Sequence, residues 1–162
     1  MKEPRYNPPK SKQTRSGASL EAGKAIYDWV GLPSDYGNRL GFIYLVINSR
    51  NGHFYIGKKL FWAKSGKVRV QSNWRDYFGS SKQVQAEIKE YGKEAFHRII
   101  LQCHDSKSEL GLAELMYQMK HITNNLCLNG IINVRLFVRP EMKLVKMEKD
   151  IVLYTRPYAF SQ

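Results

Sequence analysis

The chain has 162 residues, 43% of them hydrophobic and 12% aromatic, which is enough to bury the core of one domain. Lysine and arginine number 26 against 14 acidic residues, so the net charge is +12 at pH 7. This excess favours a polyanionic partner, whether DNA, RNA or an anionic membrane surface. We expect no membrane helix, which needs roughly 20 apolar residues, and no secretory signal. Two cysteines are too few for a disulfide framework or a four-ligand zinc site, so we expect a cytoplasmic protein with reduced thiols.

The N-terminal stretch is basic and rich in proline. Residues 1–18 carry five cations, one acid and three prolines, which predicts a disordered tail, an arm that grips phosphate, or both. Ser19 then opens a short amphipathic segment that ends at Gly31, and we expect a helix there. Its apolar positions are Leu20, Ile26, Trp29 and Val30. We therefore divide the chain into a basic arm (1–18), a domain (19–138) and a C-terminal extension (139–162).

The clearest local signal is a pair of apolar runs in residues 41–57. The runs are rich in β-branched and aromatic residues and flank the Asn-Gly dipeptide at 51–52, which is typical of tight hairpin turns. This pattern predicts a β-hairpin. The next segment, residues 58–75, holds six cations and no acid. The Ser-Gly dipeptide at 65–66 can turn a second hairpin there, and a long loop is an equally consistent interpretation.

Helices and strands alternate after the basic segment. Ser80 and Ser81 precede an amphipathic run that Gly92 ends, which predicts a helix. An apolar run over 95–103 predicts a buried strand.

A second helix should follow that strand. Ser106 and Glu109 form a capping box that predicts a helix to about Thr123. Its expected core face consists of Leu112, Met116, Met119 and Ile122. Residues 130–138 read as another strand, and the segment from Pro140 as a helix followed by a tail. The expected fold is therefore α+β, a small and mostly antiparallel sheet flanked by helices.

The expected hairpin brings chemically competent side chains together. Side chains on a strand alternate between faces, so Tyr44 and Tyr55 can meet across neighbouring strands, although such pairs are usually packing alone. Gly57 permits close approach of a ligand to the backbone, and Lys58 and Lys59 follow at once. Tyrosine hydroxyls beside lysines in a basic domain indicate a phosphodiester site.

Two tripeptides in the hairpin resemble the paired signature of the GIY-YIG nuclease family. They are FIY at 42–44 and YIG at 55–57, with Phe42 in place of the family's first glycine and Gly41 beside it. The resemblance continues through YIGKK, NWRDYFGSSK, EIKEYGKEAFHRIIL and a helix that bears Glu114, so that it covers roughly residues 41–135. The ordered blocks are similar to phage-encoded, Seg-like or homing-type members. The resemblance implies a Mg²⁺- or Mn²⁺-dependent endonuclease that hydrolyses phosphodiester bonds of double-stranded DNA, and it leaves room for a homo-oligomer.

The resemblance also implies roles for individual residues. Tyr44 would position or deprotonate the attacking water, although an unshifted tyrosine with a pKa of about 10 is a poor base. Tyr55 would hydrogen-bond the phosphate or the water, and Lys58 matches a lysine common after the second motif. Glu114 would bind the metal, since an acid in the apolar stretch LGLAELMYQM needs a reason to be there; the alternative is a solvated helix glutamate.

One catalytic position of the family does not align clearly. The family's arginine, which would clamp the phosphate, falls within the basic segment, where Arg75 is our choice and Arg69 the alternative. Tyr77 occupies the neighbourhood where the family has a histidine or tyrosine.

A second set of residues is expected to contact DNA. These residues are Lys59, Lys64, Lys67, Arg69, Ser80, Ser81, Lys82 and Asn129. Ser80 and Ser81 could instead simply cap a helix, and Asn129 could be a turn residue. The aromatic residues of the basic segment, Phe61, Trp62 and Trp74, belong either to the core or to the DNA-facing surface. The four histidines lack companions at metal-ligand spacing, and neither cysteine has a recognisable catalytic partner.

Several functions remain open on the sequence alone. A catalytically inactive GIY-YIG-fold protein that binds nucleic acid is the main alternative, and an RNA- or ribosome-bound basic protein is another. Among nuclease roles, homing, restriction, degradation of host DNA and repair are all consistent with the motifs. We find no zinc or helix-turn-helix module that would read a long target site.

Overall fold

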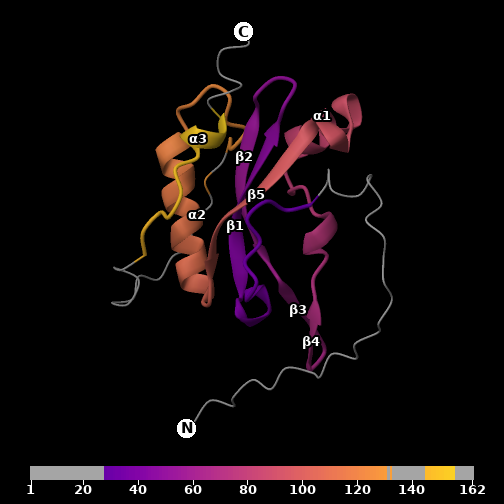
Figure 1. The fold of residues 1–162 in the computed structure, drawn as a ribbon, viewed down its shortest axis with the longest axis vertical. Coiled ribbons are helices and arrows are strands. Elements are labelled where there is room, and N and C mark those ends of the chain that lie inside the picture. The colour runs from indigo at the N-terminus through magenta and orange to yellow at the C-terminus, as the bar shows by residue number, and fades with distance from the viewer. Residues whose placement is uncertain (1–27, 131, 133–144, 156–162) are drawn as a thin grey trace.

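The structure is a computed structural model that describes residues 28–130, 132 and 145–155. Its centre is a three-stranded antiparallel sheet of β1 (Gly41–Asn48), β2 (Phe54–Leu60) and β5 (Phe96–His104), in the order β2-β1-β5 (Figure 1). β1 is buried along its whole length because it lies between two strands and is covered on both faces. The α+β fold with a small, mostly antiparallel sheet is therefore confirmed.

Both hairpins that the turn dipeptides predict are present. β1 and β2 pair antiparallel, and Gly52 adopts a φ of +75° in the connection, where a left-handed backbone favours glycine. β3 (Trp62–Ser65) and β4 (Val68–Gln71) form a separate two-stranded ribbon, with Gly66 at a φ of +62° in its turn. Of the two interpretations of the basic segment, the hairpin is the correct one.

The helices lie on opposite faces of the sheet. α2 (Lys107–His121) covers one face, and α1 (Lys82–Tyr91) lies on the other (Figure 1). The caps follow the sequence: the Ser81 hydroxyl accepts from the Val84 N–H, Ser106 accepts from the Glu109 N–H, and Gly92 ends α1. The predicted helices and the strand between them are confirmed, with β5 shifted by one residue.

The expected core face of α2 is wrong. Met119 is 62% exposed and Ile122 is also exposed, while Leu112 and Met116 are only half-buried. The residues that α2 buries are Leu110, Ala113, Tyr117, Gln118 and His121. The error arises because two stripes at helical spacing compete on this helix, and the buried one includes tyrosine, glutamine and histidine, which are amphipathic or polar residues.

The aromatic side of the sheet forms a core of its own. Trp29, Phe42, Tyr44, Phe61, Trp74 and Phe78 are all buried in this cluster. Phe61 and Trp74 are thereby core residues, while Trp62 is half-buried beside them. The indole N–H of Trp29 donates to the Trp74 carbonyl at 2.9 Å, which ties the segment before β1 to the loop before α1.

The helix expected from Ser19 lies mostly outside the described residues, and its described end is not helical. Val30 instead forms a parallel bridge with Ile99: its N–H donates to the Arg98 carbonyl at 2.9 Å, and its carbonyl accepts from the Ile100 N–H at 2.8 Å. The edge of β5 offered hydrogen-bonding groups that a β-branched residue could pair in extended form. The strand expected at 130–138 falls almost entirely outside the described residues.

Part of the expected C-terminal extension packs into the domain. Residues 145–155, which include the short helix α3 (Val152–Thr155), lie against the α2 side of the sheet (Figure 1). Ile151 is fully buried there, and the Lys149 N–H donates to the Tyr117 hydroxyl at 3.1 Å. Within the part of the chain that the structure describes, no helix is long and apolar enough to cross a membrane.

Candidate active site and nucleic-acid interface

Tyr44 and Tyr55 lie side by side on the aromatic face of the hairpin. Tyr44 of β1 pairs with Gly57 of β2, and its ring centre lies 6.3 Å from that of Tyr55. A methyl group at Gly57 would overlap the Tyr44 hydroxyl and come within 3.0 Å of the Tyr55 ring. The glycine of the second motif is therefore required for the two phenols to approach each other.

A third tyrosine completes this cluster. Tyr77, in the loop before α1, packs edge-on against Tyr44 with a ring separation of 5.9 Å. Gly79 in the same loop has a φ of +105°, and a Cβ there would lie 3.3 Å from the Tyr44 hydroxyl. The Lys59 ammonium sits 4.0 Å from the centre of the Tyr77 ring and donates to the Asn73 side chain at 2.7 Å. The Tyr44 side chain thus lies next to two glycines and two other phenols.

The surroundings of Tyr44 and Tyr55 raise the pKa of both phenols. Burial, with the neighbouring phenols of Tyr77 and Tyr55, raises the pKa of Tyr44 far above its ordinary value. Burial and the Glu114 carboxylate likewise raise the pKa of Tyr55, against a smaller opposing effect of its hydrogen bond with Ser80. Burial lowers the pKa of Lys59. The raised pKa of Tyr44 favours its protonated phenol at neutral pH.

Glu114 joins this cluster from the other side of the sheet. Its carboxylate lies 2.9 Å from the Lys58 ammonium, so that an ion pair connects α2 to the end of β2. The Glu114 side chain is 19% exposed and that of Lys58 is 46% exposed. The acid that the sequence singled out is therefore mostly buried, charge-paired and close enough to influence Tyr55 electrostatically.

The donor set of this site suits one divalent cation with an incomplete protein shell. Among the described residues, no group of three or more His, Cys, Asp or Glu side chains could hold a metal ion by itself. Mg²⁺ commonly binds one or two carboxylates and completes its shell with water and substrate phosphate. Glu114 offers such a carboxylate at a position where a cation, the Lys58 ammonium, is already stabilised. The residues present fit a cation of this kind.

The arginine chosen from the sequence does not lie in the cluster. Arg75 donates to the Tyr36 hydroxyl at 3.1 Å, and its guanidinium stacks on Trp74 at 4.4 Å. Its described contacts do not include Tyr44, Tyr55 or Glu114. Lys58 and Lys59 are instead the cations that the structure brings to the tyrosines and the glutamate.

Arg98 has a role that the sequence reading missed. Its buried guanidinium donates to the carbonyls of Arg75 at 2.6 Å and of Tyr77 at 3.1 Å, and it lies against Trp29 and Phe78. It therefore holds the loop that carries Tyr77. The one available signal was an arginine inside the apolar strand FHRIIL, where a buried charge requires partners.

Asn129 lies in the interior rather than at a DNA-facing surface. Its side-chain oxygen accepts from the Ile56 N–H at 2.8 Å, and its amide donates to the Ile56 carbonyl at 2.7 Å. Gln118 donates to the same carbonyl at 3.1 Å. Asn129 thus binds both backbone groups of Ile56 at the outer edge of β2, and it positions the strand between Tyr55 and Gly57.

The three residues expected at the start of α1 differ in their surroundings. Ser81 caps the helix, while Ser80 reaches Tyr55. Lys82 is exposed in the first turn. The simple capping interpretation therefore accounts for Ser81, and Ser80 belongs to the tyrosine cluster.

A basic groove of about 1010 Å³ adjoins the ion pair. It runs between the end of β2, the β3–β4 ribbon and the N-terminal end of α2. Within the described part of the chain, none of the side chains that line it is acidic, and the charged ones are Lys58, Lys59, Lys64, Lys67, Arg69 and Lys107. Trp62, Leu60 and Tyr77 contribute apolar surface. Four of the residues expected to bind DNA, namely Lys59, Lys64, Lys67 and Arg69, thus line one continuous surface.

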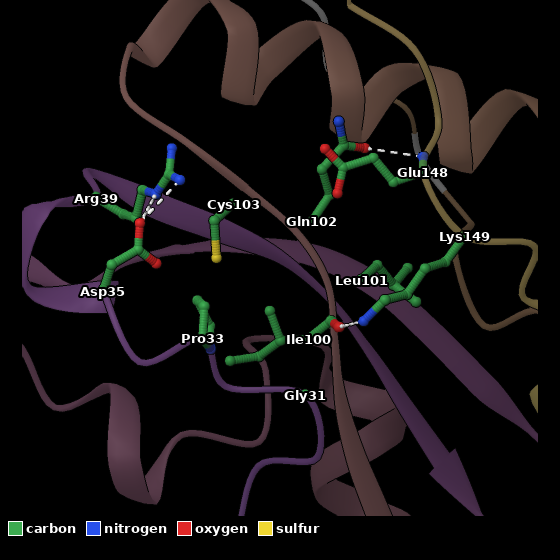
Figure 2. Close-up of a pocket in the computed structure, with 10 residues that line it drawn as sticks. All are labelled: Gly31, Pro33, Asp35, Arg39, Ile100, Leu101, Gln102, Cys103, Glu148 and Lys149. Atoms are coloured by element: carbon green, nitrogen blue, oxygen red, sulfur yellow. Dashed lines mark hydrogen bonds and ion pairs between the residues drawn. The ribbon is translucent and has the colours of Figure 1, made fainter.

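A separate pocket of about 260 Å³ lies along the outer side of β5, between residues 31–39 and the C-terminal segment (Figure 2). The Cys103 thiol lies between the Arg39–Asp35 ion pair and Lys149, which donates to the Ile100 carbonyl (Figure 2). Burial raises the pKa of Cys103 to about 11, and burial also raises the pKa of Cys127. Both thiols are therefore protonated near neutral pH, which argues against cysteine chemistry.

The sequence of the chain matches the model of a known family. A family model described as "Putative endonuclease segE, GIY-YIG domain" matches residues 29–128, which is more than half of the chain. The chain therefore belongs to the GIY-YIG nuclease family, and the Seg-like resemblance of its motifs is confirmed. The match extends from the segment before β1 to the turn after α2, so it includes Tyr44, Tyr55 and Glu114. No curated protein and no solved structure matches the chain significantly.

Proposed function

We propose that this nuclease-family protein is an endonuclease that hydrolyses phosphodiester bonds of double-stranded DNA with Mg²⁺ or Mn²⁺ as cofactor. The observation that carries the proposal is the ion pair of Glu114 and Lys58, which adjoins the tyrosine cluster at one side and the basic groove at the other. This region thus combines three features: a carboxylate able to hold a cation, hydroxyl groups able to orient water, and a cationic surface along which a DNA strand can lie. These are the parts that phosphodiester hydrolysis requires.

The tyrosines act in this proposal as neutral hydrogen-bonding groups. Tyr44 orients the attacking water through its hydroxyl, because its raised pKa leaves no phenolate at neutral pH to take a proton. Tyr55 holds either the same water or a phosphate oxygen, and Ser80 fixes the direction of its hydroxyl. Tyr77 packs edge-on against Tyr44 and restricts its rotation.

The cations compensate the charge that grows on the phosphate. Lys58 and Lys59 take this role, since both line the groove and contact Glu114 and Tyr77 respectively. A divalent ion held by Glu114 would add positive charge next to the scissile phosphate and would help water to lose its proton. Arg75 remains on Tyr36 and Trp74 and is not required in this arrangement.

The biological setting is proposed from the family branch. The Seg-like match favours a phage-encoded enzyme of homing or DNA-degrading type that acts in the cytoplasm of a host cell. A homo-oligomer would place two such sites on one duplex and allow both strands to be cut. Mass photometry of the protein with and without duplex DNA tests that arrangement.

Nicking of supercoiled plasmid tests the proposal. We expect open-circular and linear products with Mg²⁺ or Mn²⁺, and none when a chelator is present. Binding of duplex DNA without cleavage under any divalent metal would contradict the proposal and favour the second candidate, an inactive GIY-YIG-fold binding protein. A competition between duplex DNA and RNA at matched salt separates the third candidate, because an RNA-binding protein would prefer RNA.

A further inference from the structure

The β3–β4 ribbon distributes its side chains unequally between its two faces. Residues directly opposite each other on antiparallel strands point to the same face, and the pairs are Trp62 with Gln71 and Lys64 with Arg69. The other face carries Ala63, Ser65, Val68 and Val70, none of which is charged. The strand positions of the ribbon therefore place their cations and their two long polar or aromatic side chains on a single face.

The ribbon lies beyond the end of the three-stranded sheet (Figure 1) and forms one wall of the basic groove. Trp62, Lys64, Lys67 and Arg69 are among the residues that line this groove. Lys58, which contacts Glu114, lines the same groove. A duplex that lies in the groove would therefore touch the ribbon and the proposed catalytic residues together.

The ribbon is held in a fixed position relative to the sheet. The Trp62 indole N–H donates to the Arg39 carbonyl at 3.1 Å, and Arg69 donates to the same carbonyl at 3.4 Å. The Arg69 guanidinium also lies 4.7 Å from the centre of the Trp62 ring. Arg39 itself is anchored by Asp35 and Asp105, with N–O distances of 2.9 and 3.1 Å. These contacts arrange the ribbon before any ligand is bound.

From these contacts we infer that the β3–β4 ribbon enters the major groove of duplex DNA and reads base sequence next to the cleavage site. This inference rests on the proposed function. The major groove, about 12 Å wide, admits a two-stranded β-ribbon. Four residues of strand span about 13 Å at about 3.3 Å per residue, which is the length of roughly four base pairs. Lys64 and Arg69 carry donors suited to guanine, and Gln71 carries the donor and acceptor suited to adenine.

A binding selection tests the inference without requiring cleavage. The full chain with Glu114→Gln is incubated with a library of duplexes that contain a random segment, and the bound fraction is sequenced. We expect a short preferred sequence. Lys64→Ala and Gln71→Ala, made in the same background, should each reduce the preference at one or two base pairs by about 10-fold and leave the other positions unchanged.

Lys107→Ala is the matched control, because Lys107 lines the same groove from α2 rather than from the ribbon. It should weaken binding to all sequences equally and reduce the salt dependence by about one charge. Arg69→Gln serves as a second ribbon variant, with its fold checked by circular dichroism. The inference is overturned if no sequence is preferred, or if the ribbon variants weaken binding as uniformly as Lys107→Ala does.

Failure of this inference is distinguishable from failure of the proposed function. If the wild-type protein cleaves plasmid while the selection yields no preference, the nuclease assignment stands and the ribbon does not read sequence. If the selection yields a preference that the ribbon variants alter, but the wild-type protein cleaves nothing, the ribbon reads sequence and the catalytic proposal fails.

Discussion

The Lys58 ammonium lies 2.9 Å from the carboxylate of Glu114, the residue that we propose as the metal ligand. The pair joins the end of β2, which carries the second family motif, to α2, which carries the acidic residue. In the proposed site a metal ion would compete with Lys58 for Glu114, because this ammonium already neutralises the carboxylate. Lys58 also lines the basic groove, so after displacement it would still face a bound phosphate.

Replacement of Lys58 should change metal binding and cleavage in opposite directions. In Lys58→Met the carboxylate of Glu114 loses its competing cation, so we expect several-fold tighter binding of Mn²⁺ in the absence of DNA. Electron paramagnetic resonance of free Mn²⁺ measures this affinity. The cleavage rate should fall, because a cation facing the phosphate is lost. Lys89→Met, at an exposed position of α1, is the control for net charge; unchanged Mn²⁺ affinity in Lys58→Met would contradict the competition.

Gly57 should tolerate no side chain. In Gly57→Ala the new methyl group overlaps the Tyr44 hydroxyl, so we expect a loss of about 1–3 kcal/mol in the free energy of unfolding and displacement of the two phenols. Urea denaturation measures the loss of stability, and single-turnover cleavage measures the consequence for activity. Gly37→Ala is the matched control, since a Cβ at Gly37 meets no atom of the described residues within 4 Å. Equal stability of the two variants would show that the tyrosines do not need this close approach.

Variants of Lys59, Arg75 and Arg98 should differ in whether they lose cleavage activity or folding stability. We expect Lys59→Ala to reduce single-turnover cleavage at least about 10²-fold, and Arg75→Ala to reduce it less than about fivefold. Arg98→Met should instead destabilise the fold by about 2–4 kcal/mol, because a buried guanidinium gives up two hydrogen bonds to the loop of Tyr77. Cleavage by folded protein and urea denaturation give the two readouts. A larger loss of cleavage in Arg75→Ala than in Lys59→Ala would instead indicate that Arg75 is the cation that binds the phosphate.

The sequence predicts well those turns and helix ends that depend on residues a few positions apart in the chain. The Asn-Gly turn, the capping serines Ser81 and Ser106 and the terminal Gly92 act within a few positions of themselves, and each is found as expected. The family motifs likewise located Tyr44, Tyr55 and Glu114, which the structure brings to one region of the sheet.

Other features depend on partners that are distant in the chain. The pairing of Asn129 with Ile56 spans 73 residues, and the hydrogen bond from Trp29 to Trp74 spans 45. No local pattern marks such pairs. The expected core face of α2 was wrong for a related reason. Tyr117 packs in the core and its hydroxyl accepts from the Lys149 N–H of the C-terminal segment, a partner that helical spacing does not reveal.

A carboxylate far from the proposed active site should make stability depend on acid pH. Burial alone would raise the pKa of Glu87, but hydrogen bonds from Asn48 and His53 outweigh burial and lower it below its ordinary value of 4.5. The charged form is therefore favoured in the folded state. Its contribution to stability is present above the ordinary pKa and is lost as the pH falls through the lowered value.

Glu87→Gln tests this dependence. We expect it to lower the free energy of unfolding by about 1–2 kcal/mol near neutral pH, and the difference from wild type to shrink as the solution is acidified. Urea denaturation over a pH series measures both quantities. Glu90→Gln, at an exposed position of the same helix, should show no comparable difference. A difference between Glu87→Gln and wild type that stays constant with pH would contradict the assigned cause.

The most direct test of the proposed active site is the single-turnover cleavage rate of Glu114→Gln on supercoiled plasmid with saturating Mg²⁺. The substitution preserves the shape of the side chain and removes the charge that would hold the cation. We predict a loss of at least about 10³-fold in protein that remains folded and still binds duplex DNA, and a Glu90→Gln control at the wild-type rate. Cleavage by Glu114→Gln at the wild-type rate would contradict the assignment of this glutamate as the metal ligand and, with it, the proposed active site.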